Sequence, residues 1–191
     1  MKVLPHVAAS LLLLAAYPVQ ARSLLLISVD ALRADYIREA EKHGIKVPNL
    51  RRLMAEGSYA QGVRPTVPSI TFPSHITLVT GVQPNRHGIV GNDRFDPTAP
   101  GAAPQYWFAR DITADTLWQA AARAGLSTGS LGWPITAGQT AIRYNVPHLE
   151  PYESAETVKL QEAMARPDGF LAELESKLGS FYQDSSENGS R

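Results

Sequence analysis

The chain has 191 residues, and its 18 Lys and Arg balance 18 Asp and Glu, so the formal net charge is zero. This balance removes the electrostatic case for nucleic acid or an anionic membrane surface as the main partner. Hydrophobic residues make up 44% of the sequence and charged residues 19%, which is typical of a globular protein and favours one compact domain. Cysteine is absent, so any metal site must use Asp, Glu, His or hydroxyl oxygen.

The first 21 residues are typical of a secretory signal peptide. Lys2 gives a basic start, residues 7–16 are apolar, Pro18 follows, and small residues lead to Ala21. The apolar run is shorter than the roughly 20 residues that span a bilayer, so a permanent transmembrane helix is the weaker interpretation. The sequence therefore predicts cleavage after Ala21 and export, either to the periplasm or out of the cell.

Strand and helix patterns alternate along the rest of the chain. Residues 24–29 are apolar on both faces, which is typical of a buried parallel strand. The predicted strands cover residues 24–29, 58–63 and 126–131, and the predicted helices cover residues 48–56, 74–80, 115–124 and 168–178. Residues 92–115 predict a long irregular connection, and residues 183–191 predict a polar, disordered tail. The alternation predicts an α/β fold with a mostly parallel sheet flanked by helices.

Asp30 directly follows the first predicted strand. In open α/β sheets, ligands bind at the carboxyl ends of the strands, so a carboxylate at this position is placed for a metal or a phosphate-bearing ligand. Asp is also common as a turn residue or helix cap at such junctions. Its position alone leaves both interpretations open.

Thr71 lies just before Pro73, which is expected to open the helix at 74–80. The preceding residues would then lie at the positive end of that helix, where backbone N–H groups can hold an anion. A threonine hydroxyl is a poor nucleophile, and metal coordination can ionise it. With Asp30 as a second ligand, Thr71 could share one divalent ion. The alternative is a threonine that merely starts a helix.

Three further polar residues follow Thr71. Asn92 offers an amide donor for a phosphate oxygen, although a loop Asn is often a turn residue. His75 and His87 could suggest a metal site, but their separation in sequence does not match a helical ligand pair. We therefore interpret both histidines as structural hydrogen-bonding residues.

Taken together, three segments resemble the type I phosphodiesterase/nucleotide pyrophosphatase family of the alkaline phosphatase superfamily. They are LISVDALRADY at 26–36, PSITFPSHITLVTG at 68–81 and HGIVGN at 87–92. The segment SLGWP at 130–134 is similar to a family strand that ends in Trp-Pro, and the resemblance extends over residues 24–134. Related sulfatases carry a Cys-x-Pro-Ser-Arg motif where this sequence has TFPSH, so the sulfatase interpretation lacks its defining residue.

The resemblance implies an alkaline-phosphatase-like fold and a two-zinc hydrolase that acts on small phosphate esters or nucleotides. In such an enzyme a threonine attacks phosphorus and forms a phosphothreonine intermediate. By position, Thr71 matches the zinc-bound nucleophile, Asp30 matches a zinc ligand, and Asn92 matches the residue that supports the phosphate. Residues 22–182 would be the N-terminal part of the catalytic domain.

The second half of the family's metal site has no counterpart in the sequence. The family completes its site with an Asp and a His three residues apart, an adjacent Asp-His pair and a final His. After Trp133, the chain has His148, Asp168 and Asp184, which form none of these patterns. The sequence therefore predicts an apparently truncated enzyme that is inactive as this chain alone. The alternatives are a non-catalytic protein with residual anion binding and a phosphomonoesterase of the same superfamily.

Overall fold

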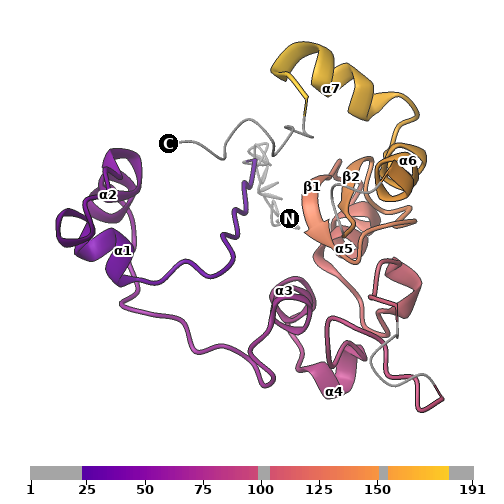
Figure 1. The fold of residues 1–191 in the computed structure, drawn as a ribbon, viewed down its shortest axis with the longest axis horizontal. Coiled ribbons are helices and arrows are strands. Elements are labelled where there is room, and N and C mark those ends of the chain that lie inside the picture. The colour runs from indigo at the N-terminus through magenta and orange to yellow at the C-terminus, as the bar shows by residue number, and fades with distance from the viewer. Residues whose placement is uncertain (1–22, 99–103, 151–154, 181–191) are drawn as a thin grey trace, which may run out of the picture.

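The computed structural model describes residues 23–98, 104–150 and 155–180 (Figure 1). The predicted signal peptide and the predicted polar tail lie outside these residues. In chain order the elements are α1 (Asp35–Arg38), the 3-10 helix η1 (Ala40–His43), α2 (Pro48–Glu56), α3 (Thr71–Thr80), α4 (Pro84–His87), the 3-10 helix η2 (Ala109–Asp111), α5 (Leu117–Arg123), β1 (Gly129–Pro134), β2 (Tyr144–His148), α6 (Ala155–Met164) and α7 (Phe170–Leu178). None of the helices in this part of the chain is long and apolar enough to cross a membrane.

Within the described residues, two parallel strands form the sheet. Gly129 of β1 pairs with Tyr144 of β2, and Pro134 pairs with His148, so both carboxyl ends lie at the same edge. Helix α6 packs against β2, whereas α3 packs against β1 and α5 (Figure 1). This arrangement confirms the predicted α/β class with a parallel sheet flanked by helices.

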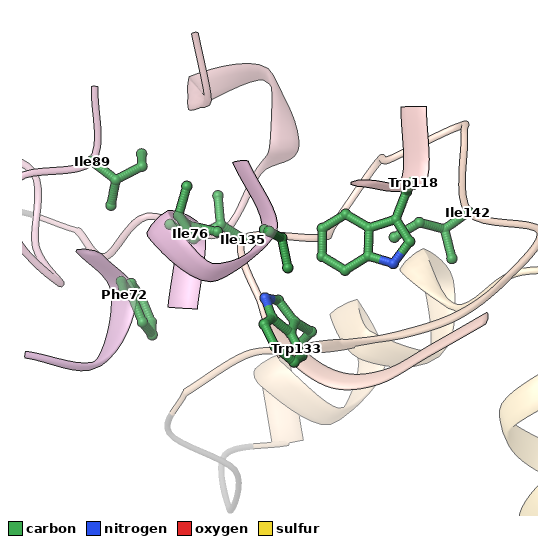
Figure 2. Packing of buried hydrophobic residues seen from close by; sticks show 8 residues of the cluster. Phe72, Ile76, Ile89, Trp118, Trp133, Ile135 and Ile142 are labelled. Atoms are coloured by element: carbon green, nitrogen blue, oxygen red, sulfur yellow. The ribbon is translucent and has the colours of Figure 1, made fainter. Parts of the chain in front are cut away.

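Helix α3 lies at the centre of the main hydrophobic core. Its buried side chains Phe72, Ile76 and Val79 follow the four-then-three spacing of one helical face. They pack in one cluster with Trp118 and Trp133, whose rings meet edge to face at 6.0 Å between centroids. Figure 2 shows Trp118 beside Ile142, with Ile89 at the other end of the cluster. Burial of this face therefore fixes how α3 is rotated about its axis.

The described helices confirm most of the helical predictions. Helix α2 has the predicted bounds, and α5 and α7 lie within the predicted ranges 115–124 and 168–178. Helix α3 begins at Thr71 rather than after Pro73, because the N–H groups of a first helical turn have no intrahelical partner and proline is tolerated there. It ends as expected at Gly81, which has a φ of 69° that favours glycine.

Two of the three predicted strands are wrong. Residues 24–29 and 58–63 form no strand, and side chains such as Leu24 (86% exposed) and Val63 (83% exposed) face solvent. A strand needs a neighbour for its backbone hydrogen bonds, and no segment of the described chain pairs with either one. The third predicted strand, at 126–131, is displaced by three residues and forms β1 at Gly129–Pro134.

The short helices α1, η1, α4 and η2 were not predicted, and strand β2 and helix α6 escape the sequence patterns for separate reasons. Strand β2 contains Pro147, which lacks the N–H of a central strand position, but it lies at an edge of the described sheet. Helix α6 buries the polar residues Thr157 and Gln161, so it has no apolar stripe. Gln161 Nε2 donates to the carbonyl of Pro147 at 2.7 Å, which satisfies its buried amide.

Because one face of α3 is buried in the core, substitutions to alanine along the helix should lower the free energy of unfolding by different amounts. Ile76 is fully buried, so Ile76→Ala should lower the free energy of unfolding by roughly 2–5 kcal/mol. Leu78 is 51% exposed on the same helix, and Leu78→Ala should cost clearly less, about 1 kcal/mol or under. Urea denaturation followed by tryptophan fluorescence measures both. Equal losses would show that the described core is not the one that holds the protein together.

Candidate functional site

The first turn of α3 brings Thr71 and Asp30 together. Thr71 Oγ1 donates a hydrogen bond to Asp30 Oδ2 at 3.0 Å, although the two residues are 41 positions apart in the sequence. Asp30 is exposed and Thr71 is partly buried, so the pair faces solvent rather than the core. Ile70, which precedes the helix, makes no side-chain cap. The structure thus places two of the predicted site residues in direct contact.

Asn92 joins the same helical turn through its side-chain oxygen. Phe72 N–H donates to Asn92 Oδ1 at 2.9 Å, and this bond leaves the amide nitrogen of Asn92 as the group able to donate to a ligand. A backbone bridge holds the main chain of Asn92. It consists of two hydrogen bonds, from Tyr106 N–H to the Asn92 carbonyl and from Arg94 N–H to the Pro104 carbonyl, both at 3.0 Å. The structure therefore brings Asn92 next to the residue that follows Thr71.

Both predicted structural histidines are held by hydrogen bonds. His87 is fully buried, its Nδ1 accepts from Ile89 N–H at 3.2 Å, and its Nε2 lies 3.0 Å from the Thr77 hydroxyl. A backbone N–H can only donate, so Nδ1 carries no proton and Nε2 donates to Thr77. His75 contacts the Thr71 carbonyl through Nδ1 at 2.8 Å. These contacts confirm the interpretation of both side chains as hydrogen-bonding residues.

His148 is a neighbour of this site that sequence patterns missed. It ends β2, its ring meets the Phe72 ring edge to face at 5.8 Å, and its Nε2 lies 3.0 Å from Glu150 Oε1. Burial lowers the pKa of His148 below its ordinary value, while the carboxylates of Glu150 and Asp30 oppose that shift. The signal that could have found His148 is its place at the carboxyl end of a strand, but β2 was not predicted.

The oxygens of Asp30 and Thr71 are close enough to bind one metal ion, but they are only part of a site. In the described part of the chain, no three His, Cys, Asp or Glu side chains gather into a group that could hold a metal. A catalytic zinc ion typically has three protein ligands. Asp30 and Thr71 therefore do not form a zinc site without further ligands.

Comparison with known proteins finds a matching family and several relatives. Residues 24–184 match the family described as type I phosphodiesterase / nucleotide pyrophosphatase. Bovine ectonucleotide pyrophosphatase/phosphodiesterase family member 3 is 33% identical over 119 residues, which cover 58% of this chain and 13% of that protein. Human family member 5 is 29% identical over 171 residues, which cover 84% of this chain and 33% of that protein. A venom phosphodiesterase of Crotalus durissus collilineatus is 28% identical over 80% of this chain and 20% of its own length. The chain thus spans a third or less of each of these relatives.

The lowered pKa values of His87 and His148 predict that the free energy of unfolding falls as the pH is lowered. Burial lowers the pKa of His87 from its ordinary value of 6.5, so below that pH the unfolded chain binds a proton that the folded chain does not. The free energy of unfolding should therefore fall between pH 6.5 and 5.5, by at most about 1.4 kcal/mol for each such histidine. Urea denaturation at the two pH values measures this loss.

Substitution separates the two histidines in that experiment. His87→Gln should reduce the loss of stability between the two pH values, and adding His148→Gln should reduce it further, because the pKa of His148 is lowered as well. The same pH dependence in the parent chain and in both variants would contradict the assignment of His87 as a neutral, buried side chain.

Proposed function

The chain belongs to the type I phosphodiesterase/nucleotide pyrophosphatase family, and from this premise we propose that it takes part in the hydrolysis of phosphodiester or pyrophosphate bonds. We propose the Thr71 hydroxyl as its nucleophile. The observation that carries this proposal is the hydrogen bond between Thr71 Oγ1 and Asp30 Oδ2, which joins the two motifs at one point on the surface.

The first role that we assign within the site is orientation of the nucleophile. Because Thr71 is the first residue of α3 and the next residue is buried in the core, its hydroxyl is held at the exposed end of the helix. The Asp30 carboxylate accepts from that hydroxyl and so sets the direction of its oxygen. In the proposed reaction, the Thr71 oxygen forms a bond to phosphorus while the bond to the leaving oxygen breaks, and water later releases the phosphoryl group.

The second role is binding of the phosphate. The Asn92 amide nitrogen can donate to a phosphate oxygen because its oxygen is already engaged by Phe72 N–H. The N-terminus of α3 carries a partial positive charge that favours the same anion. These donors have no net charge, so they can hold a phosphoryl group but do not neutralise it.

The family suggests metal-dependent catalysis, and zinc is the ion that we propose. A bound divalent cation would ionise the hydroxyl and compensate the charge of the phosphate. Asp30 and Thr71 would provide two of its oxygen ligands, and the remaining ligands of two zinc ions lie outside this pair. The substrates that we propose are small phosphate esters or nucleotides, and the signal peptide over residues 1–21 would direct the protein to the periplasm or out of the cell.

The incomplete donor set favours a second candidate function. A non-catalytic protein that keeps anion binding at the start of α3 would need Asn92 and the helix terminus but no metal. Turnover distinguishes the two candidates. The phosphomonoesterase alternative differs only in the ester it accepts, so a comparison of aryl monoester and diester hydrolysis tests it with the same protein.

Removal of the nucleophile should abolish turnover without unfolding the protein. In a longer gene product that carries the remaining zinc ligands, called full-length here, we expect hydrolysis of bis(4-nitrophenyl) phosphate with zinc, and Thr71→Ala should lower kcat by about 10³-fold or more. Acid-quenched reactions with a labelled diester should show a phosphoenzyme in the parent and none in the variant. The 191-residue chain assayed alone should show no turnover. Asp30 and Thr71 supply two metal-binding oxygens, and a catalytic zinc ion typically has about three protein ligands.

A matched control lies at the other end of the same helix. Thr80→Ala removes a hydroxyl that donates to the Ile76 carbonyl within α3, so it should leave kcat within a few-fold of the parent. A Thr71→Ala variant that keeps its turnover and its phosphoenzyme would overturn the assignment of the nucleophile. A full-length product with no activity under these conditions would favour the non-catalytic candidate.

Asn92→Asp tests phosphate binding separately from the fold. The new carboxylate still accepts from Phe72 N–H, but it replaces the N–H donors of the amide with a negative charge. We expect kcat to fall by roughly 10²–10³-fold while the free energy of unfolding stays within about 1 kcal/mol of the parent. If activity and stability fell in parallel, Asn92 would be a structural residue and not a phosphate ligand.

A further inference from the structure

We propose that His75 is a positioning residue that links the segment carrying Asp30 to the first turn of α3. The inference rests on the proposed function in one respect, because that function makes Asp30 and Thr71 the pair whose spacing matters. The link itself is a statement about the fold. It does not require that the protein turn over a substrate.

The two ring nitrogens of His75 contact two different segments. Nδ1 lies 2.8 Å from the Thr71 carbonyl oxygen, and Nε2 lies 2.9 Å from the Ser28 hydroxyl. A carbonyl oxygen can only accept, so Nδ1 carries the proton and, in the neutral ring, Nε2 accepts from Ser28. One imidazole therefore joins the backbone of the proposed nucleophile to the residue two positions before Asp30.

Packing fixes the plane of this ring. His75 is 9% exposed, and its ring meets the ring of Trp133 edge to face at 5.2 Å between centroids. Trp133 belongs to the main core cluster and is itself buried. The imidazole is thus held by the core on one side and presents both nitrogens to fixed partners. Both nitrogens are occupied, so His75 is unsuited to bind a metal here.

The segment that His75 holds has little else to hold it. Residues 24–29 pair with no strand of the described chain, and their large apolar side chains are exposed. Two side-chain hydrogen bonds connect residues 28–30 to α3, one from Ser28 to His75 and one between Asp30 and Thr71. The bond through His75 is the one that lies away from the reacting oxygens. It can therefore set the distance between Asp30 and Thr71 while those groups bind a ligand.

The natural absence of cysteine allows a direct proximity measurement. In an Asp30→Cys/Thr71→Cys double variant of the 191-residue chain, the two thiols replace the hydrogen-bonded pair, so that bond no longer holds the segments together. The equilibrium with reduced and oxidised glutathione then gives the effective concentration of one thiol at the other. We expect Ser28→Ala in this background to lower that effective concentration about tenfold, because it removes the hydroxyl that His75 accepts from.

Three further variants make the result specific to the His75 link. Ser28→Thr keeps a hydroxyl and should restore most of the effective concentration, and Ser23→Ala, in the same exposed segment, should leave it unchanged. His75→Asn keeps an N–H donor near the Thr71 carbonyl but is too short to reach Ser28, so it should match Ser28→Ala. Ser28→Ala and His75→Asn combined should lower the effective concentration no further than either variant alone, because both break the same contact.

The outcomes separate this inference from the proposed function. An unchanged effective concentration in Ser28→Ala, or losses from Ser28→Ala and His75→Asn that add, would overturn the positioning role. Ser28 is exposed, so Ser28→Ala should not unfold the protein even if His75→Asn does. In an active full-length product, Ser28→Ala should lower kcat and leave KM unchanged. An inactive product would contradict the proposed function, while the thiol equilibrium would still decide the role of His75.

Discussion

The burial of one face of α3 is the constraint on which the site depends. Phe72, Ile76 and Val79 enter the same cluster as the two indoles, and this fixes the rotation of the helix. Once the rotation is fixed, Thr71 lies about 100° around the helix axis from Phe72, at the border of the buried face. The partly exposed position of Thr71 therefore follows from hydrophobic packing one residue further along the chain. Asp30 is bonded to the Thr71 hydroxyl, and Asn92 is bonded to the N–H of the next residue.

The polar contacts around α3 are divided by burial. On the buried side, His87 and its hydroxyl and backbone partners satisfy one another without charge, which is the form that a dry environment favours. On the exposed side, Asp30 is ionisable and lies next to solvent. An anionic phosphate ester at this edge would meet one carboxylate and neutral donors, so these groups alone would not compensate its charge. The metal ion that we propose would supply the missing positive charge.

The sequence predicted which polar residues come together better than it predicted the strands, because the two depend on different information. The candidate site residues are close to turns and a helix start, and their types and order are visible in short motifs. Asp30, Thr71 and Asn92 were all named from the sequence. The structure places Asp30 in contact with Thr71, and Asn92 in contact with the residue after Thr71. Their catalytic roles stay predictions. A strand, in contrast, exists only with a partner, and residues 24–29 have the pattern of a strand without a described neighbour. His148 was missed for the same reason, since its meaning comes from its place in β2 and not from its surrounding sequence.

The backbone bridge that holds Asn92 makes the position of its side chain independent of the number of residues between Arg94 and Pro104. Tyr106 N–H and Arg94 N–H close the two sides of the bridge, and the Arg94 guanidinium also pairs with the Asp111 carboxylate. Arg94 and Pro104 are joined by one of these hydrogen bonds. A change in the number of residues between them should therefore cost little entropy and leave the amide of Asn92 in place. The number of residues in that stretch can therefore vary independently of the amide that we propose as the donor to phosphate.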